Sequence, residues 1–179
     1  PAPAPPGTRL FDFGPGPVTP GAQQVIADTI YTHERGFGFL EASGISCLDR
    51  GSGDPDRRDF CTADAPFRFV VYLPEGNYRV TLTLGDADGE STTTVRAESR
   101  RLMLERVTTA RGAFVTRSFT VNIRNSRLAA GGYLALKSRE IGALESSIVS
   151  PWQTGQRISR LISLARASST GAASISSGC

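Results

Sequence analysis

Apolar and polar side chains alternate between residues 66 and 104, and this pattern limits the fold more than any other feature of the chain. Because successive side chains of a β-strand point to opposite faces, a period of two predicts strands with one buried face. The alternating apolar positions are Phe67, Phe69, Val71, Tyr78, Val80, Leu82 and Leu84. Residues 73–77 (LPEGN) combine a proline that fixes φ with Gly and Asn, which tolerate positive φ. They predict a tight turn that joins two antiparallel strands.

The rest of the sequence extends this pattern to an all-β fold. Of 179 residues, 39% are hydrophobic, which is enough for one substantial core, and 19 glycines with 11 prolines indicate many turns. Strands are expected at residues 9–13, 67–73, 78–85, 91–97, 100–105, 113–121 and 133–137, with a short strand or turn at 24–30. Short strands at this spacing predict an antiparallel β-sandwich. No run of about 18 apolar residues is present, so no span of a membrane is expected.

Charge is distributed unevenly along the chain. Residues 1–145 contain 17 Lys and Arg and 17 Asp and Glu, whereas Arg157, Arg160 and Arg166 account for the formal net charge of +3. A nucleic-acid-binding protein concentrates basic residues on its folded surface, and the body of this chain is neutral. We therefore expect no nucleic-acid partner.

Cys47 and Cys61 flank a polar segment, LDRGSGDPDRRDF, that packing alone would hardly order. A disulfide across it would close a loop of roughly 15 residues and stabilise the fold by about 3 kcal/mol in the chain-entropy model. Two unrelated thiols are the alternative. A disulfide suits an exported protein, and the start PAPAPPGTR is typical of a mature N-terminus or a linker after removal of a signal peptide. The expected location is secreted or periplasmic.

Composition divides the chain into a Pro-rich leader (1–8), a sandwich domain (9–145) and an atypical Ser-rich tail (146–179). The tail has 10 serines, no Asp or Glu, and no strand alternation. Residues 158–167 have a weak helical period, so a poorly structured or short helical tail is predicted. The end from Ser168 is expected to be disordered, because it offers little apolar surface. The abrupt change suggests a truncated or frame-shifted gene product, a hypothesis that an uninterrupted native frame at the resequenced locus would refute.

Five blocks carry a resemblance, in order FDFGPGPVTPG, YTHERGFGF, LPEGNYRVTLTLGD, TTVRAESRRLMLE and FVTRSFTVNIRN. Over residues 10–145 the chain resembles the N-terminal domain of bacterial rhamnogalacturonan acetylesterase-like proteins. The resemblance implies a galactose-binding-like jelly roll, related to carbohydrate-binding modules and malectin-type domains. In that family the domain precedes a GDSL/SGNH esterase domain that removes acetyl groups from pectin, so an esterase domain or partner is expected.

The resemblance does not extend to a catalytic apparatus. An SGNH esterase needs a serine nucleophile in a Gly-Asp-Ser block and a base, because acyl transfer requires an activated hydroxyl. Here Gly85 and Asp86 are followed by Ala87, and His33 is the only histidine. We expect no catalytic residue in this chain, and we interpret His33 as a loop histidine.

The candidate sugar-binding residues lie in the segment YTHERGFGF. The rings of Tyr31 and Phe37 suit the apolar face of a pyranose, while Glu34 and Arg35 could bind hydroxyls or a uronate carboxylate. The alternative for Phe37 and Phe39, which are two residues apart, is that both pack in the core on one face of a strand.

Calcium is the one cofactor that the sequence suggests. Related carbohydrate-binding sandwiches often hold a structural Ca²⁺ near their first and last strands, so Asp12 is a candidate ligand by analogy. A second group of carboxylates lies at Asp49, Asp54, Asp56, Asp59 and Asp64. Neighbouring arginines neutralise much of the charge of that segment, and a solvated, salt-bridged loop is the favoured interpretation.

Two functions follow from these observations. The first is a non-catalytic carbohydrate-binding accessory domain of a pectin (rhamnogalacturonan) acetylesterase-like protein, with a pectic oligosaccharide of the plant cell wall as ligand. The second is a structural scaffold that orients or stabilises an esterase domain without binding sugar. Exposure of Tyr31 and a second aromatic ring would favour binding, whereas burial of all aromatic rings would favour the scaffold.

Overall fold

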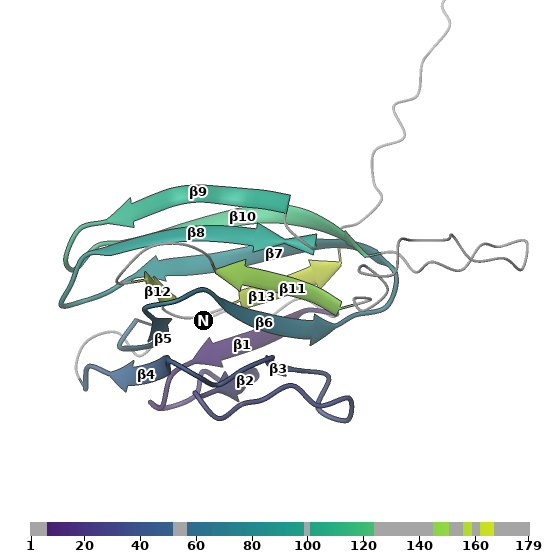
Figure 1. The fold of residues 1–179 in the computed structure, drawn as a ribbon, viewed down its shortest axis with the longest axis horizontal. Helices are drawn as coiled ribbons and strands as arrows, with labels where there is room; N and C mark the ends of the chain where they lie inside the picture. The colour runs from purple at the N-terminus through teal and green to yellow at the C-terminus, as the bar shows by residue number, and fades with distance from the viewer. Residues whose placement is uncertain are drawn as a thin grey trace, which may run out of the picture.

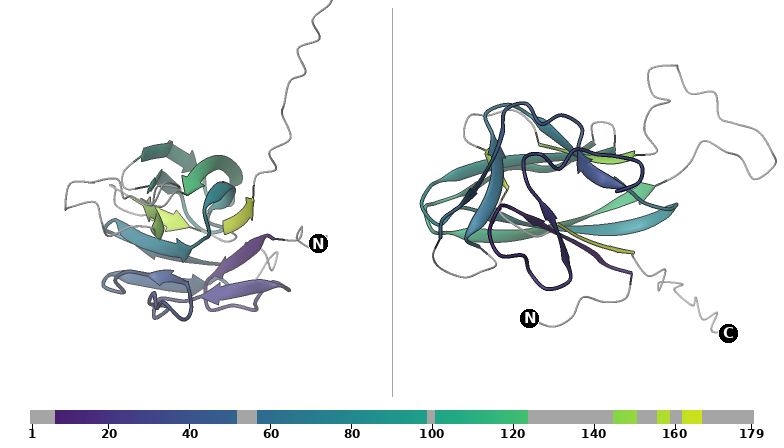
Figure 2. Two further views of the ribbon diagram at one scale, coloured as in Figure 1. Left: turned by 90° about the vertical axis from the view of Figure 1, so that its right-hand side faces the viewer. Right: turned by 90° about the horizontal axis from the view of Figure 1, so that it is seen from below.

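The computed structural model describes residues 7–51, 57–98, 101–123, 145–150, 156–158 and 162–166. These residues form strands and turns without an α-helix, which confirms the predicted all-β class. Figure 1 and the left panel of Figure 2 place the N-terminal strands, coloured purple to blue, on one side of the molecule. Strands β8 (Ser91–Ala97), β9 (Arg101–Thr109) and β10 (Phe114–Ile123) lie on the other side.

Two five-stranded sheets form the sandwich. The first has the order β10-β7-β13-β1-β2, with β7 at Gly76–Gly85, β13 at Ile162–Arg166, β1 at Arg9–Phe13 and β2 at Ala22–Val25. The second has the order β3-β6-β11-β8-β9, with β3 at Phe37–Phe39, β6 at Phe67–Tyr72 and β11 at Glu145–Ser150. Neighbouring strands are antiparallel, apart from the parallel pair β1 and β2.

The core between the two sheets is built around Phe69. Its ring lies 5.4 Å from that of Phe11 and 4.8 Å from that of Phe13, both on β1 of the opposite sheet, as measured between centroids. It also lies 6.4 Å from Phe37 and 5.5 Å from Phe39 on the neighbouring strand β3. All five rings are buried. The alternation seen in the sequence therefore directs phenylalanines from both sheets into one aromatic core.

The predicted tight turn at residues 73–77 does not form a hairpin. Strands β6 and β7 on either side of it belong to different sheets, so the turn carries the chain from one layer of the sandwich to the other. The Tyr78 hydroxyl donates a hydrogen bond to the Pro74 carbonyl at 2.8 Å, which closes the turn. Turn chemistry specifies a local reversal of the chain, but packing decides whether the second strand pairs with the first or crosses the core.

The prediction for residues after 145 needs correction. The expected short helix is wrong, because Ile162–Arg166 form strand β13, which pairs with β1 on one side and β7 on the other. Strand β11 pairs along the whole of β6, from Glu145 opposite Tyr72 to Ser150 opposite Phe67. Backbone hydrogen bonding on two sides outweighs a weak helical period. The expected strand at 133–137 and the expected disorder from Ser168 lie outside the described residues.

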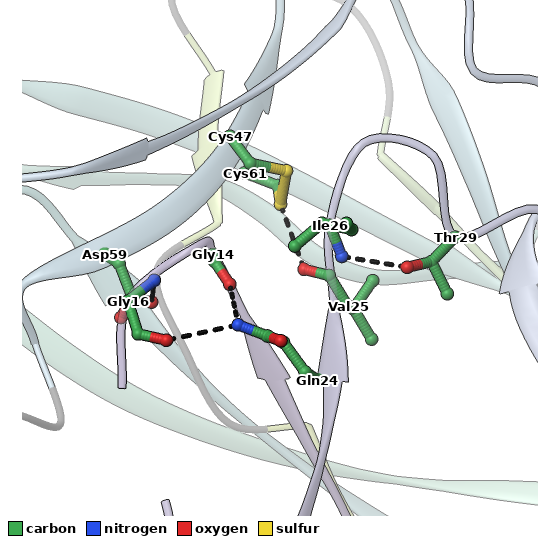
Figure 3. Close-up of a disulfide and its surroundings, with 9 residues drawn as sticks. All are labelled: Gly14, Gly16, Gln24, Val25, Ile26, Thr29, Cys47, Asp59 and Cys61. Atoms are coloured by element: carbon green, nitrogen blue, oxygen red, sulfur yellow. Dashed lines mark hydrogen bonds between the residues drawn. A yellow bond between two sulfur atoms is a disulfide. The ribbon is translucent and has the colours of Figure 1, made fainter. Parts of the chain in front are cut away.

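A third, three-stranded sheet has the order β12-β5-β4, with β12 at Gln156–Ile158, β5 at Asp59–Ala63 and β4 at Ile45–Asp49. Cys47 and Cys61 are opposite each other in the β4–β5 pair and form the predicted disulfide (Figure 3). The Cys61 Sγ also lies 3.5 Å from the Val25 carbonyl oxygen. The two ends of the segment interpreted as a polar loop thus belong to a cross-linked pair of strands that contacts β2.

Candidate functional site

The segment that carries the candidate sugar-binding residues is a turn fixed to β6. The Gly36 N–H donates to the Thr32 carbonyl at 2.8 Å, and the Arg35 N–H donates to the Thr32 hydroxyl at 3.1 Å. The Tyr72 N–H, at the end of β6, donates to the Gly36 carbonyl at 2.8 Å. Backbone hydrogen bonds therefore place this turn beside the last residue of β6.

The structure separates the predicted residues by exposure. Glu34 and Arg35 are exposed at the tip of the turn, and the Arg35 guanidinium donates to the Ile30 carbonyl. Tyr31 is half-buried, with its hydroxyl oxygen shielded from solvent. Tyr31, Glu34 and Arg35 stay predictions as sugar ligands.

Phe37 does not belong to an exposed site. Its side chain is 7% exposed, and its ring lies 5.0 Å from that of Phe11. The packing alternative therefore holds for Phe37 and for the fully buried Phe39, and the Phe37 ring has no open face for a sugar. Gly38 between them has a φ of +144°, and a Cβ there would lie 2.4 Å from the Tyr31 backbone nitrogen. The close approach of β3 to the start of the turn thus requires glycine.

Tyr72 carries an exposed aromatic ring at this end of the sandwich, and it is not among the residues expected from the sequence to bind a sugar. Its side chain is 49% exposed, and the His33 ring meets it edge to face at 5.8 Å. The alternation along β6 could have found it, because Arg68, Val70 and Tyr72 share the face opposite to Phe69 and Val71. An aromatic side chain at the exposed end of that face was the available signal.

Arg9 of β1 completes this surface. Its Nη1 donates to the Tyr72 carbonyl at 3.2 Å and its Nη2 donates to the Gln23 Oε1 at 3.0 Å. Below it, the guanidinium carbon lies 5.2 Å and 5.6 Å from the ring centroids of Phe11 and Phe37. This burial lowers the pKa of Arg9 below its usual range, because it desolvates the charged guanidinium. We call the four residues Arg9, Gln23, His33 and Tyr72 the Tyr72 patch.

The acidic residues at the other candidate positions have structural partners. Asp12 is buried, and its Oδ2 accepts the Thr19 N–H at 2.7 Å, so it fixes the loop between β1 and β2. Within the described ranges, no three His, Cys, Asp or Glu side chains gather in a way that could hold a metal ion. A calcium ion at Asp12 would therefore depend largely on carbonyl oxygens and water.

Of the carboxylates near the disulfide, Asp49 is salt-bridged as interpreted, whereas Asp59 is not solvated but fully buried, and its Oδ2 accepts the Gly16 N–H at 2.8 Å. Arg58 contacts both oxygens of Asp49, at 2.8 and 2.5 Å, and holds the pKa of that carboxyl at about 2, with help from the Gly51 N–H. Arg50 makes a two-point contact with the fully buried Asp86, at 3.2 and 2.8 Å. Asp86 was compared above with the Asp of the Gly-Asp-Ser block of SGNH esterases. In this structure it connects the β4–β5 hairpin to the end of β7.

No helix in the part of the chain that the structure describes has the length and apolar character needed to cross a membrane.

Comparisons with known proteins identify the relatives of this fold. A family model described as "Beta-agarase/YXIM esterase-like, galactose-binding domain-like" matches residues 9–131. The chain is 30% identical over 100 residues to Beta-agarase A of Zobellia galactanivorans, which covers 54% of this chain and 18% of that protein.

Solved structures show the same fold. Protein YXIM from Bacillus subtilis matches with a TM-score of 0.59 at 20% identity, over 90% of this chain and 40% of that one. A chain in the crystal structure of plant peptide RALF23 in complex with FER and LLG2 matches with a TM-score of 0.57 at 13% identity, over 94% of this chain and 42% of that one. The chain thus spans less than half the length of each of these relatives.

These findings confirm the resemblance to a galactose-binding-like domain of esterase-like proteins. They relate the domain to carbohydrate-active proteins, an agarase and an esterase-like protein, without assigning it a ligand. The fold, the match over residues 9–131 and the agarase relative agree with one another, and the chain belongs to the beta-agarase/YXIM esterase-like family of galactose-binding-like domains.

Proposed function

We propose that this chain is a non-catalytic carbohydrate-binding accessory domain, which holds a glycan near an esterase-like domain or partner. The observation that carries the proposal is the exposed ring of Tyr72, which meets the ring of the exposed His33 in the turn at residues 31–36. An exposed ring next to polar side chains is what a pyranose requires, because its C–H face is apolar and its edge carries hydroxyls. Membership of a family that includes an agarase relative supports the same function.

The proposed ligand is a pectic oligosaccharide of the plant cell wall, as the resemblance to rhamnogalacturonan acetylesterase-like proteins implies. We expect weak binding, because a shallow site buries little area and its polar groups must be desolvated. The proposed location is outside the cytoplasm, and the Cys47–Cys61 disulfide supports it, since such bonds persist in oxidising compartments. A structural calcium ion at Asp12 is part of the proposal.

A scaffold without sugar binding is the second candidate, and the aromatic core favours it. The described phenylalanines on β1, β3, β5 and β6 are all buried, so most aromatic surface of the domain serves packing. Tyr72 is the exception that favours binding.

Titration calorimetry distinguishes the two candidates. The ligands are rhamnogalacturonan, galacturonan and agarose oligosaccharides, and the variants are Tyr72→Ala and Tyr31→Ala. Leu102→Ala is the matched control, because Leu102 is similarly exposed (47%) but lies on β9 at the far edge of the same sheet as Tyr72. Binding is expected to weaken at least about tenfold in Tyr72→Ala and to be unchanged in Leu102→Ala. Absence of heat with every oligosaccharide, from a folded sample, would contradict binding and favour the scaffold.

A further inference from the structure

Arg9 is held in an unusual position for a surface arginine. It belongs to β1 in the first sheet, yet its Nη1 donates to the carbonyl of Tyr72 on β6 in the second sheet, so it bridges the two layers. Its second contact, to Gln23 Oε1, also involves a neutral acceptor. A guanidinium has five donors, and two of them are directed at these oxygens. The side chain is therefore fixed while several of its donors have no acceptor among the described residues.

The surroundings of the Arg9 charge also differ from those of five other arginines of the domain. Arg50, Arg58, Arg68, Arg101 and Arg111 each form a salt bridge with a carboxylate. Among the described residues, no Asp or Glu forms such a pair with Arg9. Its half-buried position lowers its pKa through desolvation, but an arginine keeps its charge at neutral pH. An anion bound there would offset the cost of that desolvation.

Arg9 hydrogen-bonds to the backbone carbonyl of Tyr72, so its charge is anchored at the residue that carries the exposed ring. His33 supports the Tyr72 ring from the side at 5.8 Å. The patch thus combines a fixed planar fork of donors with an exposed aromatic face. A fork of this kind matches a carboxylate, which it binds through two parallel hydrogen bonds.

We infer that the Tyr72 patch binds an acidic sugar unit, a hexuronate, whose carboxylate contacts the Arg9 guanidinium while its pyranose ring stacks on Tyr72. The inference rests on the proposed carbohydrate-binding function and names the sugar class and the residue that selects it. Gln23 and His33 supply hydrogen-bonding groups at the edges of the same patch, suited to the hydroxyls of the sugar.

The test compares four oligosaccharides in calorimetric titrations of the full chain. They are a galacturonan, its methyl ester, a neutral galactan and a sulfated galactan, all of matched length. The methyl ester keeps the pyranose but removes the negative charge, so the unmodified protein already tests the role of the carboxylate. The galacturonan is expected to bind at least about tenfold more tightly than its methyl ester, a difference of about 1.4 kcal/mol, because hydrogen bonds to a charged carboxylate are stronger than those to a neutral ester.

Variants assign the preference to a residue. Arg9→Met should abolish the difference between acid and ester, and Arg9→Lys should reduce it, because a lysine lacks the planar fork. Arg68→Met is the control, since Arg68 lies on β6 with Tyr72 but pairs with Glu41 at 3.0 Å. Circular dichroism establishes that each variant is folded. If Arg9→Met does not fold, Arg9→Lys and the acid-to-ester comparison decide the question.

The outcomes separate the inference from the proposed function. Equal binding of acid and ester, or a preference that survives in Arg9→Met, would overturn the inference and leave a neutral carbohydrate-binding domain. Tighter binding of the sulfated galactan than of the galacturonan would also overturn it, since the selected group would then be a sulfate ester. No binding of any of the four would refute the inference and the proposed function together.

Discussion

Reduction of the Cys47–Cys61 disulfide should destabilise the domain by an amount that can be worked out from the chain. The two cysteines are 14 residues apart, and closing a loop of that length removes conformational entropy from the unfolded state. With the relation ΔS ≈ −2.1 − 1.5R ln n, the entropy is about −10 cal/mol/K, or about 3 kcal/mol at 25 °C. For a chain of this size each kcal/mol lowers the melting temperature by roughly 2–4 °C, so a fall of about 6–12 °C is expected.

Urea titrations followed by circular dichroism, with and without dithiothreitol, measure the loss in free energy of unfolding in a Cys179→Ser background. Thermal melts of the same samples measure the fall in melting temperature. Reduction keeps both sulfur atoms in place, so packing changes little and the effect of the cross-link dominates. The double variant Cys47→Ala/Cys61→Ala is the control and should not respond to dithiothreitol. A loss below about 1 kcal/mol, in a sample whose thiol count confirms reduction, would refute the entropic reasoning. It would mean that pairing of β4 with β5 restrains the loop without the bond.

Three further changes test other parts of the structure. Phe69→Ala should lower the free energy of unfolding by about 3–5 kcal/mol in urea titrations, because it removes the ring at the centre of the aromatic core; a loss below about 1 kcal/mol would contradict that role. The pKa of Asp49 is about 2 when folded, against about 3.9 when unfolded, so its pairing with Arg58 stabilises the fold above about pH 4 and this contribution is lost as pH falls toward 2. Unfolding titrations across that range should show a smaller pH dependence in Asp49→Asn than in the parent. Calcium bound at Asp12 should increase the free energy of unfolding by about 2.7 kcal/mol at a hundredfold excess over Kd, and it should therefore raise the melting temperature. An equal melting temperature in Ca²⁺ and in EDTA would exclude the calcium proposal.

The sequence predicted features that depend on neighbouring residues. The alternation around Phe69 and Leu82 identified strands and their buried faces, because burial on a sheet follows the period of the backbone. The disulfide was predicted from the spacing of Cys47 and Cys61, although the strands that bring them together were missed. Strands β4 and β5 were not predicted, because the residues between them are charged and rich in glycine. Asp49 at the end of β4 forms an ion pair with Arg58, which directly precedes β5.

Features that depend on distant partners could not be predicted in this way. Residues 73–77 have the chemistry of a hairpin turn, but the choice between pairing and crossing the core depends on strands elsewhere in the chain. The helical period of residues 158–167 was outweighed by hydrogen bonds to β1 and β7. The Tyr72 patch is a case of the same kind, since Arg9 and Tyr72 are 63 residues apart and meet only in the folded sandwich.

The position of β13 sets an order of events during synthesis of the chain. Strand β13 lies between β1 and β7, and Arg9 is opposite Leu164, a separation of 155 residues (164 − 9). β1 therefore has no antiparallel neighbour in its sheet until residues 162–166 have emerged from the ribosome. Contacts between such distant residues form slowly, because a long loop must close before they are gained. The first and last of the described strands therefore close the sheet together, as a late step of folding.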